Sequence, residues 1–462
     1  MFMKNIKGMR CGALLRSKNK MNEIILIALI TLMGAMFVKL VSRDTHVIQN
    51  WAIGFLIGLG VTTFVSFGLS WLGLRINYIN ILFIVIFGLF LISIVNIFIR
   101  TNFIDLFKIR NIFDTKATSF ENLILILLIL FFTISFILST YFPINVWDAL
   151  ALYDFRAKVI ASTGYFVQIA NNFNYFSHYP LYTSLTHTFV YLSGGENPQY
   201  LYSIYLMSFA VVYYFFARKN VSKVVALVST LLLVTIPEIF EHSTIAYTNL
   251  PYTIFYVCGI FYLNYSILEK RNDYLFLSSI LIGLSTWVRS DLPFWLSGAF
   301  LVILFSIKLK RVWPVIIYFP VFLLIQQTWN LFASSLFGAD YSTSGQLISA
   351  GGSIISKINF YRFYEVLTYL YTNVFVSWGI VSVLFVMALI WNFCNRKIIA
   401  YPLLIIILLN ILGLIAGTYV FSFKVAEWKD IADSATRMAM FFPPLMLYYV
   451  TLSFGRSFRK DI

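Results

Sequence analysis

The chain has 462 residues, of which 60% are hydrophobic, 19% are aromatic and only 11% are charged. Soluble domains carry about 25% charged residues, so this chain cannot fold mainly in water. Its long apolar runs, without segments of about ten alternating residues, exclude a closed barrel and predict an all-α polytopic membrane protein. The net charge of +15 lies mostly in short clusters between apolar runs, a pattern typical of cytoplasmic loops rather than of nucleic-acid binding.

Apolar runs that could each cross a bilayer recur along the chain and predict about thirteen transmembrane helices. These runs occupy 22–41, 51–73, 78–99, 122–142, 199–217, 222–236, 249–268, 274–289, 292–307, 312–331, 364–393, 398–420 and 438–455. Gly54 and Gly58 form a G-x-x-x-G pair in the second run, which predicts close packing of that helix against a neighbour.

Basic clusters predict the orientation of the later spans. If the spans alternate, these clusters all fall on one side, which is then the cytoplasmic side of a plasma or inner membrane. They are "ARKNVSK" (217–223), "EKRND" (269–273), "KLKR" (308–311), "NRK" (395–397) and the C-terminal tail. Three long polar segments, 143–198, 332–362 and 421–437, then face the extracytoplasmic side.

Residues 1–20 do not follow this pattern. Counting back through four spans places them outside, although they contain six Lys and Arg residues. Either one early segment does not span, or translation starts at Met21, where "MNEIILIALI" opens directly into the first helix; we favour the second. A signal peptide is a further alternative, but the apolar run is long and no small-residue cleavage site follows it.

The segment "VWDALALYDFRAKVIASTGYF" (146–166) follows the fourth span and carries four charges. Asn145 or Asp148 can cap a helix that continues through Ala161. Asp154 and Lys158 are then in i,i+4 register, and Asp148 lies on another face. The simplest expectation is an interfacial helix with an exposed Asp154–Lys158 ion pair, which leaves Asp148 as the acidic residue without an evident structural role.

Four further segments fall on the same predicted side. They are "SHYPLYTSLTHTFVYLSGGENPQYLYSIY" (177–205), "AYTNLPYTIFY" (246–256), "GLSTWVRSDLPFWL" (283–296) and "WKDIADSATRMAMFFPPL" (428–445). Arg289 and Asp291 are charges at a tight turn between two apolar runs. Charges in such places are functional candidates because burying them is costly, but a mutual ion pair at the headgroup level is an equal alternative.

The order of these segments resembles the GT-C family of polytopic glycosyltransferases that use lipid-linked sugars, which includes the protein O-mannosyltransferases and the bacterial transferase that adds aminoarabinose to lipid A. The segment from "VWDALALYDF" to "YLSGG" is similar to the family's first external loop, with its acidic residue and surface helix. "AYTNLPYTIFY" resembles an "A-Y-A-D-L-P" helix start, "TWVRSDLP" a "W-T-(R/K)-x-E-G" turn, and "ATRMAMFFPPL" a late "R-Y-x-x-P" helix start. The similarity is best over 143–300, looser to 455 and absent from the first hundred residues.

The resemblance implies a division of the chain, with two departures from the family pattern. The division is a basic segment at 1–20, accessory helices at 21–120, a catalytic membrane region at 121–455 and a cytoplasmic tail at 456–462. The family usually has a second acid next to the first, whereas Ala149 follows Asp148, so Asp154 is the only second acid in the segment. Asn249 stands where the family has the acid of its "D-L-P" motif.

The resemblance further implies transfer of a sugar from a polyprenyl phosphate to a hydroxyl on a glycan, lipid or protein, at the extracytoplasmic face. Asp148 is the expected general base, with Asp154 as the other catalytic carboxylate. Cations would stabilise the leaving phosphate, first Arg289 and Arg437, then Arg156, Lys158, His178 and Lys424. The full set expected to contact substrate is Arg156, Lys158, His178, Tyr179, Asn249, Arg289, Asp291 and Arg437. A requirement for Mg²⁺ or Mn²⁺ stays open, and no metal ligands are assigned.

Several of these residues also have simpler interpretations. His178 is either a phosphate or metal contact or a structural residue of an aromatic loop, while His187 and His242 are weaker candidates. Arg437 is either a phosphate ligand or an interfacial arginine that snorkels. The Gly- and Ser-rich segment 335–357 is either a lid or an external loop.

Three other classes of function compete with a transferase. A transporter or flippase of lipid-linked glycans would show charges within spans or paired broken helices, and no internal repeat is evident. A surface-polysaccharide ligase or polymerase would carry its largest external loop late in the chain, whereas here it is early. A membrane scaffold would tolerate Asp148→Asn.

Overall fold

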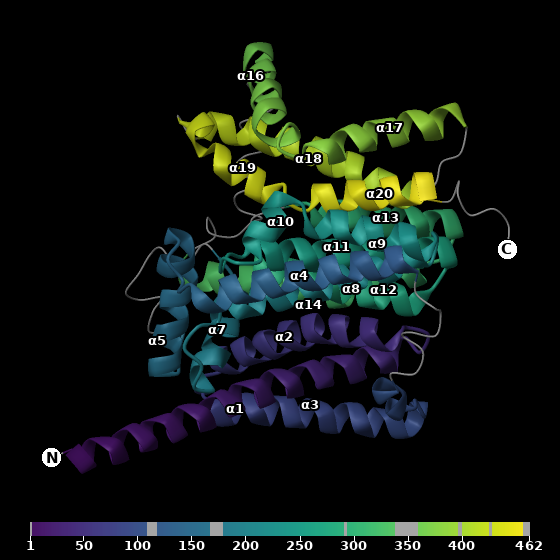
Figure 1. The fold of residues 1–462 in the computed structure, drawn as a ribbon. Helices are drawn as coiled ribbons and strands as arrows, with labels where there is room; N and C mark the ends of the chain where they lie inside the picture. The colour runs from purple at the N-terminus through teal and green to yellow at the C-terminus, as the bar shows by residue number, and fades with distance from the viewer. Residues whose placement is uncertain are drawn as a thin grey trace. The chain divides into compact units, whose positions relative to one another are not determined.

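The computed structural model describes residues 2–108, 118–166, 179–290, 293–337, 359–395, 400–424 and 427–455, without the side chains of 2–20, 424 and 430–434. All regular structure in these residues is helical, as predicted from composition. The chain forms two compact units, and Figure 1 shows their helices as ribbons.

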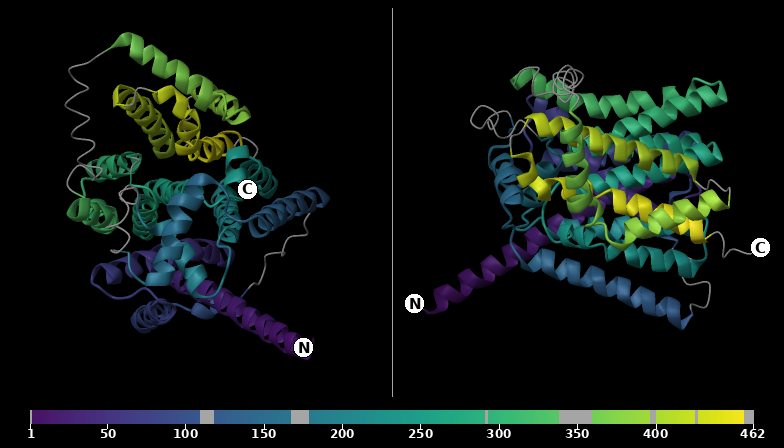
Figure 2. Two further views of the ribbon diagram at one scale, coloured as in Figure 1. Left: turned by 90° about the vertical axis from the view of Figure 1, so that its left-hand side faces the viewer. Right: turned by 90° about the horizontal axis from the view of Figure 1, so that it is seen from above.

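The first unit comprises residues 1–112, 134–208 and 243–247. Its helices are α1 (Phe2–Val41), α2 (Val47–Trp71), α3 (Tyr78–Ile99), the 3₁₀ turn η1 (Phe103–Phe107), the end of α4 (Ser119–Tyr141), the π-helix η2 (Ala149–Asp154), α5 (Phe155–Thr163), α7 (Tyr182–Leu192) and the start of α8 (Tyr200–Arg218). Helix α1 continues unbroken from the N-terminal segment into the first apolar run (Figures 1 and 2).

Close contact between α1 and α2 organises the first unit. A methyl group added at Gly54 would overlap the backbone of Ala35, and one added at Gly58 would overlap the carbonyl group of Ile30. The two helices therefore approach each other at backbone distance, which only glycine permits. This confirms the close packing predicted from the G-x-x-x-G pair.

The second unit comprises residues 113–133, 209–242 and 248–462. It begins with parts of α4 and α8 and continues with α9 (Lys223–Val234), α10 (Pro237–His242), α11 (Asn249–Glu269), α12 (Asn272–Val288), α13 (Trp295–Leu309), α14 (Trp313–Phe337), α16 (Phe360–Leu370), the π-helix η5 (Tyr371–Phe375), α17 (Ile380–Cys394), α18 (Tyr401–Lys424), the 3₁₀ turn η6 (Trp428–Ile431), α19 (Ala432–Met438) and α20 (Phe442–Gly455). Helices α11 and α12 pack side by side, and the Ser278 hydroxyl donates a 2.8 Å hydrogen bond to the carbonyl oxygen of Gly259.

Helix α4 begins with a buried charged cap. The Glu121 carboxylate accepts a 3.0 Å hydrogen bond from the backbone N–H of Thr118, and the Thr118 hydroxyl accepts one from the N–H of Glu121. This capping box satisfies two N–H groups that the helix itself leaves open. Lys223 pairs with the same carboxylate at 3.1 Å, so the charge at the start of an apolar helix is neutralised.

Seven helices in the described part of the chain are long and apolar enough to cross a membrane, or eight if a bent pair counts as one span. The seven are α1 from Met21, α2, α3, α4, α8, α14 to Ser335 and α18. Each of the thirteen expected runs lies largely in helix, but α9 and α13 are shorter apolar helices. The length and hydropathy of the helices thus support a polytopic membrane protein with fewer full-length spans than predicted.

The expected continuous span at 364–393 is instead a broken helix pair. The axes of Phe360–Phe375 and Ile380–Cys394 differ by 108°, and α16 and α17 meet at a sharp angle in Figure 1. The break lies at Gly379, which has φ +54°, a backbone conformation that glycine adopts without the steric cost other residues incur. The apolar composition of 364–393 predicted a membrane-spanning segment, but composition contains no information about a change in helix direction.

Candidate functional site

Two amide side chains form hydrogen bonds with the C-terminal end of α4. The Asn197 amide donates to the carbonyl oxygens of Ser139, Thr140 and Phe142 at 3.1–3.3 Å, and Gln199 donates to Phe142 at 3.3 Å. These bonds satisfy carbonyl groups that the end of a helix leaves without intrahelical partners. The segment that leads to Asp148 therefore starts from a fixed point.

Asp148 lies at the first turn of the next helical segment and is partly exposed. Its backbone is already helical, with φ −63° and ψ −37°, and its side chain makes no capping hydrogen bond. Of the two predicted caps, Asn145 or Asp148, Asp148 therefore does not fill that role. Asp148 is the seventh residue after Tyr141, the last residue of the α4 span.

The expected single helix through Ala161 is divided into two types of helix. Residues Ala149–Asp154 form a π-helix, in which the N–H of Phe155 bonds to the carbonyl oxygen of Leu150, and α5 follows. Short π-helical turns often occur at functional sites. The extra residue per turn changes which side chains share a face, which a pattern read at 3.6 residues per turn cannot anticipate.

Asp154 is buried, and it forms the centre of a polar network. Its side chain is 1% exposed, its Oδ2 lies 2.8 Å from Nζ of Lys158, and its Oδ1 lies 3.4 Å from Nδ1 of His187. The Tyr191 hydroxyl donates to the same Oδ1, and Nε2 of His187 lies 3.2 Å from the Tyr202 hydroxyl. The predicted Asp154–Lys158 pair is thus confirmed, whereas the expectation that it is an exposed surface pair is wrong for Asp154.

The partners of Asp154 keep it ionised despite its burial. Burial by itself favours the neutral acid, but the hydrogen bond and charge of His187, with hydrogen bonds from Lys158 and Tyr191, outweigh it and lower the pKa of Asp154 to about 2. Burial and the Asp154 carboxylate both raise the pKa of Tyr191, which stays a neutral donor. The network is therefore a carboxylate with its donors in place at neutral pH.

Arg156 is also buried, and its guanidinium donates to oxygen atoms of α7 and of the residues before it. Its Nε donates to the Ser184 hydroxyl at 3.0 Å, and its two terminal nitrogens donate to the carbonyl oxygens of Tyr179 at 3.0 Å and Pro180 at 3.5 Å. Burial lowers the pKa of Arg156 to about 10, so it is still charged at neutral pH. Asp154 at the end of η2 and Arg156 at the start of α5 together bind this helical segment to α7.

His187 is the residue that sequence reasoning underrated. It is buried in α7 among Thr183, Ser184, Thr186 and Thr188, all buried as well. A cluster of hydroxyl residues around one histidine, in a segment with few charges, is the sequence signal that could have indicated a polar face. Its partner in η2, Asp154, could not be read from the sequence, because the pairing depends on how two separate helical segments pack.

In the second unit, two residues expected to contact substrate are brought together. Arg289 follows the end of α12 and is 7% exposed, and its guanidinium donates to Oδ1 of Asn249, the first residue of α11, at 3.4 Å. An amide oxygen leaves the charge of the arginine in place, whereas a carboxylate there would neutralise it.

Phe441, just before α20, joins three segments of the resemblance. Its ring centroid lies 6.3 Å from that of Tyr252 and 5.0 Å from that of Tyr256 in α11, and 4.7 Å from that of Phe294 after the α12 turn. The Tyr256 hydroxyl also donates to the carbonyl oxygen of Phe294 at 2.9 Å. The segments "AYTNLPYTIFY", "TWVRSDLPFWL" and "ATRMAMFFPPL" thus meet at one aromatic cluster.

The remaining candidates are placed only in part. Arg437 is partly exposed on α19, where the neighbouring Thr436 hydroxyl donates to the carbonyl oxygen of Asn373 at 2.8 Å. His178, Asp291 and the Lys424 side chain lie outside the described residues. Within the part of the chain that is described, no three His, Cys, Asp or Glu side chains gather as a metal site would require.

These observations define an all-helical, multi-pass membrane protein with two polar clusters, one around Asp154 and one around Arg289. Comparison with known proteins takes the identification no further. No family model matches the chain, and no curated protein or solved structure shows a significant match.

Proposed function

We propose that this chain is an integral-membrane glycosyltransferase that moves a sugar from a polyprenyl phosphate to an acceptor hydroxyl on the extracytoplasmic face. The observation that carries the proposal is the meeting at Phe441 of the three segments that resemble GT-C motifs. These three segments are far apart in sequence. The resemblance of each one to a motif would not by itself bring them into contact, so their meeting at Phe441 is separate support.

The two acidic residues of the first external segment take different roles in this proposal. Asp154 is 1% exposed and surrounded by its own donors, so an acceptor hydroxyl could not reach it. Asp148 is partly exposed and follows a transmembrane helix by seven residues, where a membrane-anchored donor would present its sugar. We therefore assign the base to Asp148 and a positioning role to Asp154, through the attachment of α5 to α7.

The reaction requires one proton transfer and one substitution at carbon. Asp148 takes the proton of the acceptor hydroxyl, whose oxygen forms a bond to the anomeric carbon of the sugar. The bond from that carbon to the phosphate oxygen breaks, and the polyprenyl phosphate leaves with the electron pair. Its added negative charge would be stabilised by a guanidinium, for which Arg289 is the buried candidate and Arg437 the more exposed one.

The test is a transfer assay in membranes with a panel of radiolabelled polyprenyl-phosphate sugars. Asp148→Asn removes the base and is expected to reduce transfer about 10²-fold or more. Asp105→Asn is the matched control, because Asp105 is 39% exposed and forms a surface ion pair with Lys108. Full transfer by the Asp148 variant would contradict the assignment of the base, and no transfer of any sugar by the wild type would contradict the proposed reaction.

A further inference from the structure

A cavity lies in the first unit, between the end of α2 and the start of α3. It has a volume of about 250 Å³ and is lined mainly by Leu69, Leu74, Ile76, Ile81, Phe83 and Ile84, with Ser66, Arg75 and Asn80 as its polar members. Pockets that enclose a whole small molecule usually measure about 300–1,000 Å³. This cavity therefore fits only part of a ligand whose remainder lies outside it.

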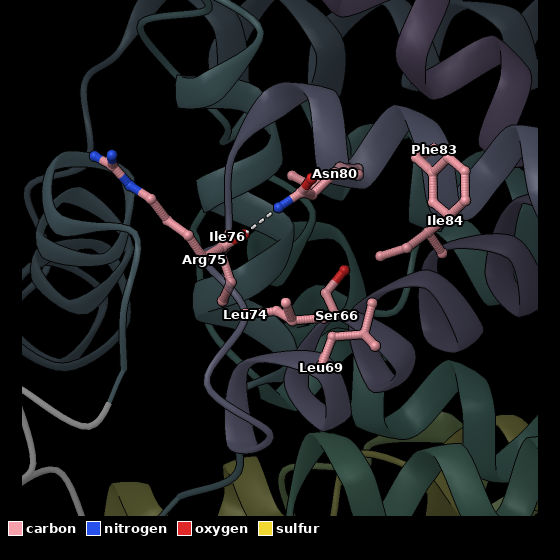
Figure 3. Close-up of a pocket in the computed structure, with 9 residues that line it drawn as sticks. Ser66, Leu69, Leu74, Arg75, Ile76, Asn80, Phe83 and Ile84 are labelled. Carbon is pink, nitrogen blue, oxygen red and sulfur yellow. Dashed lines mark hydrogen bonds between the residues drawn. The ribbon is translucent and has the colours of Figure 1, made fainter.

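Ser66 provides the evidence that the cavity has a polar occupant. Its side chain is 2% exposed, and its hydroxyl has no hydrogen-bond partner among the described residues. Figure 3 shows this hydroxyl directed into the space between Ile76, Asn80 and Ile84. Buried hydroxyl groups are almost always hydrogen-bonded, so an unsatisfied one that faces a cavity indicates a missing partner. Water is a poor candidate, because it needs two to four polar contacts and the lining is mostly apolar.

The depth of Ser66 matches a particular part of a lipid. Ser66 lies five residues before Trp71, the end of α2, which is about 7.5 Å along a helix. The headgroup layer on each side of a bilayer is about 5–8 Å thick. In a bilayer that α2 spans from Val47 to Trp71, this depth corresponds to the junction between headgroup and chains, where a glycerophospholipid carries ester carbonyl groups that accept hydrogen bonds.

Arg75 provides a cation at the corresponding headgroup position. It lies in the α2–α3 turn and is exposed, and its side chain extends outward from the rim of the cavity (Figure 3). Among the described residues its guanidinium has no hydrogen bond or ion pair, and its Cγ and Nε pass over Gly164, where an added methyl group would overlap them. The Asn80 amide donates to the Arg75 carbonyl oxygen at 2.7 Å, which holds the turn in place and leaves the arginine side chain available for a phosphate.

We infer that this cavity binds one glycerophospholipid. The Ser66 hydroxyl donates to an ester carbonyl, the start of one acyl chain fills the space between α2 and α3, and Arg75 pairs with the phosphate. The surrounding α3 surface exposes Ile79 at 75% and Phe83 at 65%, so the rest of the lipid remains in contact with the bilayer. The bound lipid lies beside α5, because the N–H of Ile76 bonds to the carbonyl oxygen of Gly164 at 2.7 Å.

Native mass spectrometry of the purified full chain with phosphatidylglycerol tests this inference. Ser66→Met fills the cavity, and Arg75→Gln removes the charge; each is expected to weaken binding of one lipid about tenfold. Ser66→Ala removes only the hydroxyl, without crowding the cavity, and is expected to weaken binding about fivefold. Glycerol 3-phosphate, which has the phosphate but no chains, is expected not to bind.

The controls make the same kinds of substitution at a serine of α3 and at the arginine that follows α3, both away from the cavity. Ser93 is exposed, and its hydroxyl donates to the Leu89 carbonyl oxygen of its own helix; Arg100 lies at the other end of α3. Ser93→Met and Arg100→Gln are expected to bind the lipid as the wild type does. Unchanged binding by Ser66→Met and Ser66→Ala would overturn the site. So would equal losses in the control variants, or glycerol 3-phosphate binding as tightly as the lipid, which would indicate a plain anion site.

Discussion

Nδ1 of His187 lies 3.4 Å from Oδ1 of Asp154, and both side chains are only 1% exposed. The contact joins α7 to the π-helical turn that precedes α5. A buried carboxylate is costly unless its donors are in place, so this relationship links the folding of the external segment to the integrity of one polar network.

Asp154→Asn is expected to destabilise the protein by about 2–3 kcal/mol, because it removes a buried charge whose partners were arranged around it. The difference should appear as a lower midpoint of thermal unfolding in detergent. Asp105→Asn is the control, since an exposed pair such as Lys108–Asp105 contributes at most about 1 kcal/mol. Equal effects of the two substitutions would mean that the network contributes no more than a surface ion pair.

The same network predicts a dependence of stability on acid pH. The pKa of Asp154 is lowered from 3.8 to about 2, so its contribution to stability is complete above about pH 4 and decreases as the pH falls towards 2. The difference in unfolding midpoint between wild type and Asp154→Asn should therefore be smaller at pH 3 than at pH 5. A difference that stays constant to pH 3 would show that the aspartate is not ionised in the folded protein.

Gly54→Ala is expected to disrupt the α1–α2 contact, because its methyl group would overlap the backbone of Ala35. Overpacking of this kind costs about 1–3 kcal/mol. Gly68→Ala, on the same helix, meets no atom within 4 Å and should be neutral or slightly stabilising, since alanine favours helix. Thermal unfolding of the two variants compares them directly; a Gly54 variant as stable as the Gly68 variant would argue against the close contact.

Arg289→Gln is expected to raise the apparent KM for the polyprenyl-phosphate donor about tenfold, because it removes the buried cation assigned to the phosphate. This prediction rests on the proposed function and uses the same transfer assay. Arg271→Gln is the control at the other end of α12, where Arg271 pairs with Asp273. If the two variants have the same KM as the wild type, Arg289 has a structural role only.

Labelling of single cysteines from outside the membrane tests the predicted sidedness. Trp147→Cys and Leu72→Cys, at side chains 74% and 81% exposed, should react from the same side, because the α2–α3 turn bonds to the end of α5. Asp44→Cys, in the turn between α1 and α2, should react only from the other side. The background replaces Cys11 and also Cys394, which is exposed. Reaction of position 147 from the cytoplasm would place Asp148 on the wrong side for the proposed donor.

The sequence by itself determined the class of protein, the positions of the helices and the close contact at Gly54 and Gly58. These properties depend on local composition, since long apolar runs have few alternatives to helices in a membrane. It also predicted the Asp154–Lys158 pair, which lies within one helical segment, where spacing along the chain is enough.

Tertiary structure alone decided that Asp154 is buried against His187, that Arg289 meets Asn249, and that three distant segments meet at Phe441. Burial and pairing between helices depend on which faces pack together, and a π-helical turn before α5 shifts those faces relative to an ideal helix. The sharp bend between α16 and α17 was likewise decided by the tertiary structure. An apolar run shows that a segment prefers a membrane to water, but its direction comes from the contacts it makes.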